Sequence, residues 1–166
     1  MKVIFCDVDG VLNNPYTKGR TPDGYRGVTN DLVRNLRKIV SATGAVIVLS
    51  SDWRLIRDDP KHRKSYYYLL RKLKFAGGLS IADQTEDIRW DRRGHEIRLF
   101  LEEHPEVTDF VILDDIPFGD FGVCGLLSNL VLTNPNKGLT SKDVDRAVRI
   151  LQGEYVKPCE LERNFD

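Results

Sequence analysis

Short apolar runs that end in acidic or hydroxyl residues are the feature that most constrains this chain. The runs are VIF at 3–5, VIVL at 46–49 and FVIL at 110–113, and none of them alternates apolar with polar residues. Strands that are buried on both faces lack such alternation. Helical patterns lie between the runs, and this order predicts an α/β fold: a three-layer α/β/α sandwich around a parallel, Rossmann-like sheet.

The apolar pattern predicts five strands and four helices. The expected strands are Val3–Cys6, Ala45–Leu49, Leu79–Ala82, Phe110–Leu113 and Leu130–Thr133. The expected helices are centred on Leu32–Val40, Tyr66–Leu73, Ile97–Leu101 and Ser141–Leu151. Gly44 and Gly77-Gly78 are suited to end the first two helices, and Thr140 or Ser141 can cap the last one.

Composition limits the kind of protein that this chain can be. Its 166 residues fit one domain, residues 1–166, and its 25 basic and 25 acidic residues balance, so net charge indicates no partner. No apolar run approaches the roughly 18 to 20 residues of a membrane span, and Asp7 interrupts any secretory signal. We therefore expect a soluble, cytoplasmic protein. Three scattered cysteines favour neither a disulfide framework nor a zinc site.

Three of the expected strands end in residues suited to phosphate chemistry. DVDG at 7–10 follows the first strand, SSDWR at 50–54 the second, and Asp114-Asp115 the fourth. Ligands of parallel sheets bind beyond the carboxyl ends of the strands, so these residues should converge. Adjacent carboxylates form the oxygen-rich site that Mg²⁺ prefers. A turn or a helix cap would also use aspartate, but convergence of all three segments by chance is improbable.

The ordered segments DVDGVLN, VIVLSSDWR and FVILDD resemble the haloacid dehalogenase superfamily over nearly the whole chain. More narrowly, SSDWR, RRGHEI and NKGLT resemble the small phosphatase domain of RNA-repair proteins, a relative of polynucleotide 3′-phosphatases. The resemblance implies a Mg²⁺-dependent phosphatase. Asp7 would attack phosphorus and form an aspartyl-phosphate, and Asp9 would serve as general acid and then as general base.

The resemblance also implies further site residues. The implied metal ligands are Asp7, the backbone carbonyl of Asp9, Asp114 and Asp115. Ser50 is expected to bind the phosphoryl group through its hydroxyl, with Ser51 as the alternative. The superfamily's basic residue, usually lysine, is replaced here by Arg93 or by Lys137. Arg54 would contact the substrate phosphate or form an ion pair with a nearby acid.

Other residues that often carry chemistry are assigned structural roles. The histidines His62, His95 and His104 have no ligand spacing, so surface or capping roles are expected. Cys6 lies within a strand and is expected in the core. Trp53 and Trp90 are expected to pack in the core or at the rim of the site.

The size of the substrate that can enter depends on two segments in which members of the superfamily often carry an inserted cap domain. Both are small here: Asn13–Val28 is a loop, and Leu55–Arg89 holds one helix and one strand. An open site admits a DNA or RNA end, and the basic, tyrosine-bearing segment Lys61–Lys74 would flank it. The alternatives are a phosphatase for a small metabolite or a phosphoprotein, for which that segment is a solvated face, and a binding module without turnover.

Overall fold

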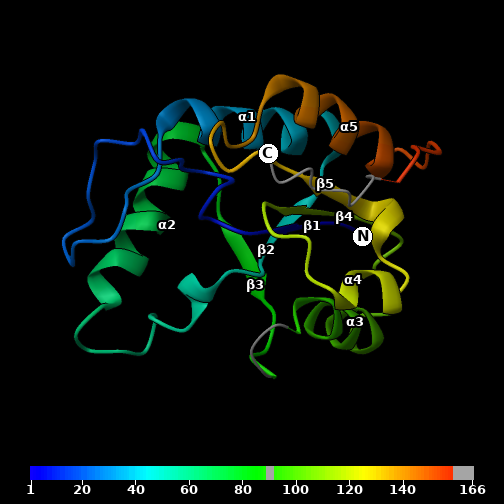
Figure 1. Cartoon of the computed structure of the whole chain (residues 1–166), viewed down its shortest axis with the longest axis horizontal. Helices are drawn as coiled ribbons and strands as arrows, with labels where there is room; N and C mark the ends of the chain where they lie inside the picture. Colours follow the sequence, from blue (N-terminus) through cyan, green and yellow to red (C-terminus); the bar gives the residue numbers. More distant parts are fainter. Residues whose placement is uncertain (89–91, 159–166) are drawn as a thin grey trace.

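A parallel five-stranded sheet forms the centre of the computed structural model, which describes residues 1–88 and 92–158 (Figure 1). Its strands are β1 (Lys2–Cys6), β2 (Val46–Leu49), β3 (Ile81–Gln84), β4 (Asp109–Asp114) and β5 (Leu130–Leu132). The strand order is β3-β2-β1-β4-β5. The predicted α/β fold with a parallel Rossmann-like sheet is therefore confirmed.

Helices cover both faces of the sheet, as Figure 1 shows. One face carries α1 (Asn30–Thr43), α2 (Arg63–Gly77) and α5 (Ser141–Leu151), and the other carries α3 (Arg93–Glu103) and the short α4 (Asp120–Val123). On the first face Leu36 and Leu69 pack with Ile4 of β1. On the second face Ile97 packs with Phe5, the next residue along the same strand. Successive strand residues thus serve two separate cores.

The helix ends follow local sequence rules. The first turn of α5 has a capping box, in which the Thr140 hydroxyl accepts from the Asp143 N–H and the Asp143 carboxylate accepts from the Thr140 N–H. Helix α1 ends at Gly44, whose φ of 69° is left-handed and is easily adopted only by glycine. Both ends were predicted from the sequence.

The third strand begins two residues later than predicted. Gly78 ends α2 in a left-handed conformation, and the Leu79 N–H donates to the Leu73 carbonyl at 3.1 Å. Leu79 is therefore part of the helix terminus and packs in the core, so pairing with β2 starts only at Ile81. Helix α4 and the 3₁₀ turns η1 (Asp52–Arg54) and η2 (Leu127–Asn129) were not predicted, because three or four residues show no periodicity. Trp90 and Cys159 lie outside the described residues.

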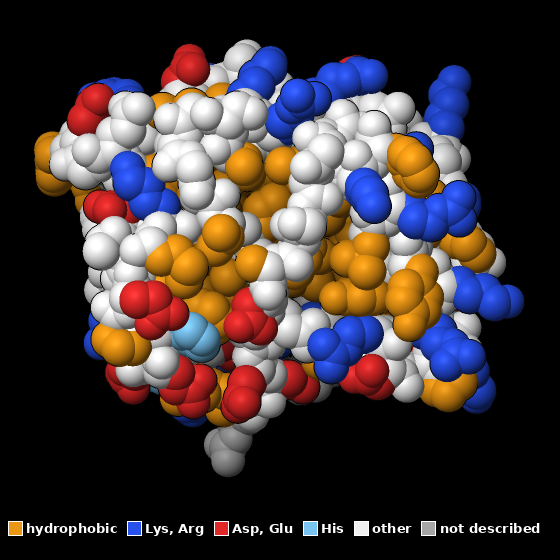
Figure 2. Space-filling view, turned by 180° about the vertical axis from the view of Figure 1, so that it is seen from behind, with side chains coloured by type: hydrophobic (Ala, Val, Ile, Leu, Met, Phe, Trp, Pro, Cys, Tyr) orange, Lys and Arg blue, Asp and Glu red, His pale blue; other side chains and the backbone are white. Residues whose placement is uncertain are grey.

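The surface is uneven in charge. Lys and Arg side chains gather, with hydrophobic ones between them, on the side of the molecule where α2 lies, at the right of Figure 2. Acidic side chains gather at the lower left of that view. Within the described residues, none of the helices is both long enough and apolar enough to cross a membrane.

Candidate active site

The carboxyl ends of β1, β2 and β4 meet at one edge of the sheet. Cys6 pairs with Leu49 of β2 on one side and with Leu113 of β4 on the other. The next residue of each strand therefore lies in line: Asp7, Ser50 and Asp114. Phe5, Val48 and Ile112 face α3. Residues two positions apart in a strand share a face, so the side chains of Asp7, Ser50 and Asp114 point to the α3 side as well. All three are buried.

Asp7, Asp114 and Asp115 form a cluster of carboxylates. One oxygen of each lies within 4.8 Å of the others. Asp114 Oδ1 accepts from the Ile116 N–H at 2.9 Å, whereas Asp114 Oδ2 is buried and has no hydrogen-bond partner among the described residues. A buried carboxylate oxygen without a donor is costly unless a cation satisfies it. The cluster therefore fits a hard divalent cation such as Mg²⁺.

The protonation of this cluster reflects its burial. Burial raises the pKa of Asp7 to about 7, although the Arg93 guanidinium and a hydrogen bond from Ser51 act in the opposite direction. Burial, followed by the charge of Asp7, raises the pKa of Asp114 well above its ordinary value. Positive charge that enters the cluster would lower both pKa values and ionise the carboxyl groups.

Asp9 is held by donors on both of its oxygens. The Asn13 amide donates to Oδ1 at 2.7 Å, and the Trp53 indole N–H donates to Oδ2 at 2.8 Å. The backbone between Asp9 and Asn13 is also fixed, because the Gly10 N–H donates to Asn13 Oδ1 at 3.1 Å and the Thr133 hydroxyl donates to the Gly10 carbonyl at 2.9 Å. Asp9 is thus positioned beside Asp7 by residues from three segments.

The two serines after β2 occupy different environments. The Ser50 hydroxyl is fully buried and has no partner among the described residues. The Ser51 side chain hydrogen-bonds Asp7 and accepts from the Trp53 N–H at 3.4 Å. Ser51 therefore contacts the expected nucleophile, while Ser50 retains an unused hydroxyl at the same edge. Both remain candidates for binding the phosphoryl group.

Of the two predicted basic residues, Arg93 lies beside the carboxylates. It is the first residue of α3, is buried, and lowers the pKa of both Asp7 and Asp114. Its guanidinium also pairs with Asp52 at 3.1 Å. Lys137 is exposed in the turn after β5. That turn reaches the same edge through its backbone, since the Asn14 amide donates to the Lys137 carbonyl at 3.3 Å.

Arg54 forms a buried ion pair. Its guanidinium lies 2.7 Å from Glu96 Oε1, and both side chains are almost fully buried. Asp52 and Asp87 lie farther away, at 3.7 and 3.9 Å. Of the two predicted contacts of Arg54, the structure thus contains the ion pair. Glu96 was missed by the sequence analysis, although its position one helical turn after Arg93 within RRGHEI was a usable indication.

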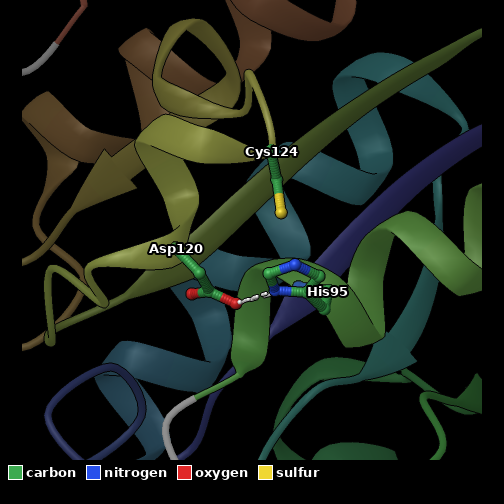
Figure 3. Close-up of side chains that lie close together, drawn as sticks. All are labelled: His95, Asp120 and Cys124. Atoms are coloured by element: carbon green, nitrogen blue, oxygen red, sulfur yellow. Dashed lines mark hydrogen bonds and ion pairs between the residues drawn. The ribbon is translucent and has the colours of Figure 1, made fainter.

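His95, Asp120 and Cys124 lie close together at the start of α3 (Figure 3). Asp120 Oδ2 accepts from the His95 backbone N–H at 3.0 Å and lies 2.9 Å from His95 Nδ1. A Cβ on Gly94 would lie 2.9 Å from the Asp120 side chain, so glycine permits this approach. Asp120 therefore caps the first turn of the helix that begins at Arg93, and the His95 ring is a second partner of the same carboxylate. One ligand atom each of His95, Asp120 and Cys124 lies within 4.8 Å of the others, a grouping that could hold a metal ion, so the structural role expected for His95 stays a prediction.

Comparison with known proteins agrees with the fold. A family model described as the HAD domain in Swiss Army Knife RNA repair proteins matches residues 3–144. The match spans most of the chain, and the chain belongs to this family of haloacid dehalogenase domains. No curated protein and no solved structure matches it at a significant level.

Proposed function

We propose that this protein is a Mg²⁺-dependent phosphatase that removes a terminal phosphate, preferably a 3′-phosphate, from a polynucleotide. The main support for phosphatase chemistry is the buried cluster of Asp7, Asp114 and Asp115 beside Arg93. Support for the substrate class comes from the family, whose described members act in RNA repair, and from the small segments between the strands.

The proposed reaction has two steps at Asp7. In the first, an Asp7 carboxylate oxygen attacks phosphorus, the bond from phosphorus to the ester oxygen breaks, and protonated Asp9 gives its proton to that oxygen. In the second, water attacks the aspartyl-phosphate, gives a proton to Asp9, and Asp7 leaves as a carboxylate. Inorganic phosphate is released, and both aspartates return to their starting states.

The surrounding residues would prepare these steps. Mg²⁺ held by Asp7, Asp114, Asp115 and the Asp9 carbonyl would neutralise charge on the phosphoryl group. Arg93 supplies a fixed positive charge near Asp7, and a serine hydroxyl, from Ser50 or Ser51, donates to a phosphoryl oxygen. Asn13 and Trp53 hold the Asp9 carboxyl in place.

Phosphate release tests this proposal directly. The substrates are a 3′-phosphorylated RNA oligonucleotide and a panel of small phosphomonoesters, each with Mg²⁺ and with EDTA. We expect metal-dependent release that favours the oligonucleotide and that is abolished by Asp7→Asn. Asp83→Asn makes the same chemical change on an exposed residue of β3 and should retain full activity.

The other outcomes separate the parts of the proposal. Release from small esters alone would overturn the polynucleotide substrate and retain the mechanism. Substantial release by Asp7→Asn would overturn Asp7 as nucleophile. Absence of release from every substrate would overturn the enzymatic function.

A further inference from the structure

A pocket of about 380 Å³ lies between the start of α1 and the second half of α2. Asn30 and Arg34 line it from α1, and Tyr68, Arg71, Lys72 and Phe75 line it from α2. We name it the α1–α2 pocket. None of the described residues that line it is acidic. The pocket is separate from the carboxylate cluster, to which none of these residues belongs.

The α1–α2 pocket carries positive charge that the protein only partly neutralises. Arg34 pairs with the exposed Asp31 at 2.6 Å, a surface contact of small energy. Lys72 donates to the Asn30 side chain at 3.3 Å, a neutral partner. Arg71 is exposed and has no carboxylate partner among the described residues. An anionic ligand would therefore find at least two available cations.

Aromatic rings lie among these cations. The Phe75 side chain is 80% exposed, which is unusual for a large apolar group on a helix. Tyr68 is half-buried, and Lys72 Nζ lies 5.8 Å from the centre of its ring. Rings beside Lys and Arg are the combination that binds single-stranded nucleic acid, because bases stack on the rings while phosphates pair with the cations.

The α1–α2 pocket is connected to the edge of the sheet that carries Asp7. The Tyr68 hydroxyl packs against Gly27, where a Cβ would come within 2.6 Å of it. Gly27 belongs to the segment between β1 and α1, and the Thr29 N–H of that segment donates to the Leu12 carbonyl at 3.0 Å. A single-stranded nucleic acid held in the pocket would thus lie beside the protein segment that leads from Asp7 to α1.

We propose that the α1–α2 pocket binds the single-stranded part of a polynucleotide whose terminal phosphate lies at Asp7. This inference rests on the proposed function. It adds a second contact between the protein and the polynucleotide, away from the reacting phosphorus. Arg71 and Lys72 pair with backbone phosphates, and Phe75 stacks on a base. The pocket thus selects polynucleotides over small phosphomonoesters.

Binding to the Asp7→Asn chain tests the pocket without turnover. The probe is a fluorescent single-stranded RNA of about ten nucleotides with a 3′-phosphate, and its anisotropy is followed from 50 to 200 mM salt. We expect Arg71→Glu to weaken binding about tenfold and to reduce the slope of log Kd against log salt by about 0.7 or more. Phe75→Ala should weaken binding at least fivefold and leave the slope unchanged.

Matched controls lie on other parts of the surface. Arg98→Glu makes the same charge change on α3, and Tyr155→Ala removes a ring that is 81% exposed. Both should bind within twofold of the parent. The proposal is overturned if Arg71→Glu and Phe75→Ala bind like the parent, if the controls weaken binding equally, or if the parent binds no RNA at 50 mM salt.

The two proposals fail in different measurements. Failure of the proposed function appears as absence of phosphate release from any ester by the chain with Asp7 intact. Failure of the pocket appears as unchanged RNA binding by the pocket variants. Loss of RNA binding in those variants supports the pocket even where no ester is hydrolysed.

Discussion

Gly10 shows how closely a single residue couples the backbone to the carboxylate cluster. Its φ is +71°, and a Cβ there would lie 2.3 Å from the Asp115 carboxyl carbon. Alanine at this position would therefore meet backbone strain and would also push Asp115 out of the cluster.

We predict that Gly10→Ala lowers the free energy of unfolding by about 2 kcal/mol or more and weakens Mg²⁺ binding. Thermal unfolding and a Mg²⁺ titration measure the two effects. Gly24→Ala is the matched control, because Gly24 has a φ of +91° but no atom within 4 Å of the added Cβ. It should lose about 1 kcal/mol and bind Mg²⁺ normally. Equal effects of the two substitutions would contradict the role of the Asp115 contact.

Asp7 gives the metal-free protein a defined dependence on pH. Its pKa is about 7 in the folded protein, above the roughly 3.9 of an unfolded aspartate. Between about pH 4 and pH 7 the folded state thus binds more protons than the unfolded state, so this group's contribution to stability falls as pH rises.

We predict that Asp7→Asn melts at a higher temperature than the parent in EDTA at pH 8, by about 3–10 °C, because asparagine stays neutral. The difference should shrink toward pH 5, where Asp7 of the parent is protonated. Circular dichroism melts across this range measure it. A parent that is the more stable of the two at pH 8 would contradict the unfavourable burial of the Asp7 charge.

Sequence analysis predicted some site residues better than others. Asp7, Asp114 and Asp115 could be placed because each lies at the end of a strand of recognisable pattern or directly after it. The partners of Asp9 and Arg54 could not be placed, because those contacts join distant segments: Trp53 lies 44 residues from Asp9, and Glu96 lies 42 residues from Arg54. Spacing in a single sequence indicates pairs within one helix, such as Arg93 and Glu96, but it does not indicate which donor from a distant segment will meet a given carboxylate.

The short turn η1 is the element that connects the second strand with Asp9, the proposed acid/base residue. It places Trp53, which is nearly fully buried, so that the indole N–H meets Asp9 and the ring lies 6.0 Å from that of Tyr25. Tyr25 belongs to the segment between β1 and α1. The position of Asp9 therefore depends on Trp53, which is far from it in the sequence, and Trp53 in turn packs against Tyr25 of the segment to which Asp9 belongs.

We predict that Trp53→Phe lowers kcat about tenfold for esters whose leaving oxygen must be protonated. Phenylalanine keeps an aromatic ring in the space but removes the donor that positions Asp9. The effect should be smaller for p-nitrophenyl phosphate, whose leaving group needs no proton. Steady-state kinetics on both kinds of ester, with unchanged circular dichroism, provide the check. An equal loss on both would point to a packing effect instead.

Among the elements, length and periodicity decided what could be predicted. Strands β1, β2, β4 and β5 are apolar runs, helices α1, α2, α3 and α5 carry apolar stripes at helical spacing, and their predicted positions agree with the structure to within a few residues. The start of β3 was predicted two residues too early, because Leu79 packs in the core at the end of α2 instead of pairing with β2. Helix α4 is four residues long and has no pattern to detect.

At the scale of the whole molecule, the carboxylate cluster lies across two neighbouring strands in the middle of the sheet. Asp7 follows β1, while Asp114 ends β4 and Asp115 follows it, and these two strands pair along their length. A cation bound there would hold both strands and relieve the repulsion between their carboxylates, and it would bind only the folded chain.

We predict that millimolar Mg²⁺ raises the melting temperature by several degrees at pH 7.5, with a smaller rise at pH 5, where protons compete for the cluster. Asp114→Asn should remove the rise. Asp83→Asn, the same change on an exposed strand residue, should keep it. Differential scanning fluorimetry measures all three, and an equal rise in Asp114→Asn and the parent would contradict the cation site.

The hydrogen bond from the Trp53 indole to Asp9 has an optical consequence. Indole emission depends on the charge beside the ring, and the chain contains two tryptophans, Trp53 and Trp90. In a Trp90→Phe chain, all tryptophan emission would come from the ring that contacts Asp9. Each change in the charge or position of Asp9 would then alter the emission of Trp53, so the proposed proton transfers at Asp9 could be followed without an added label.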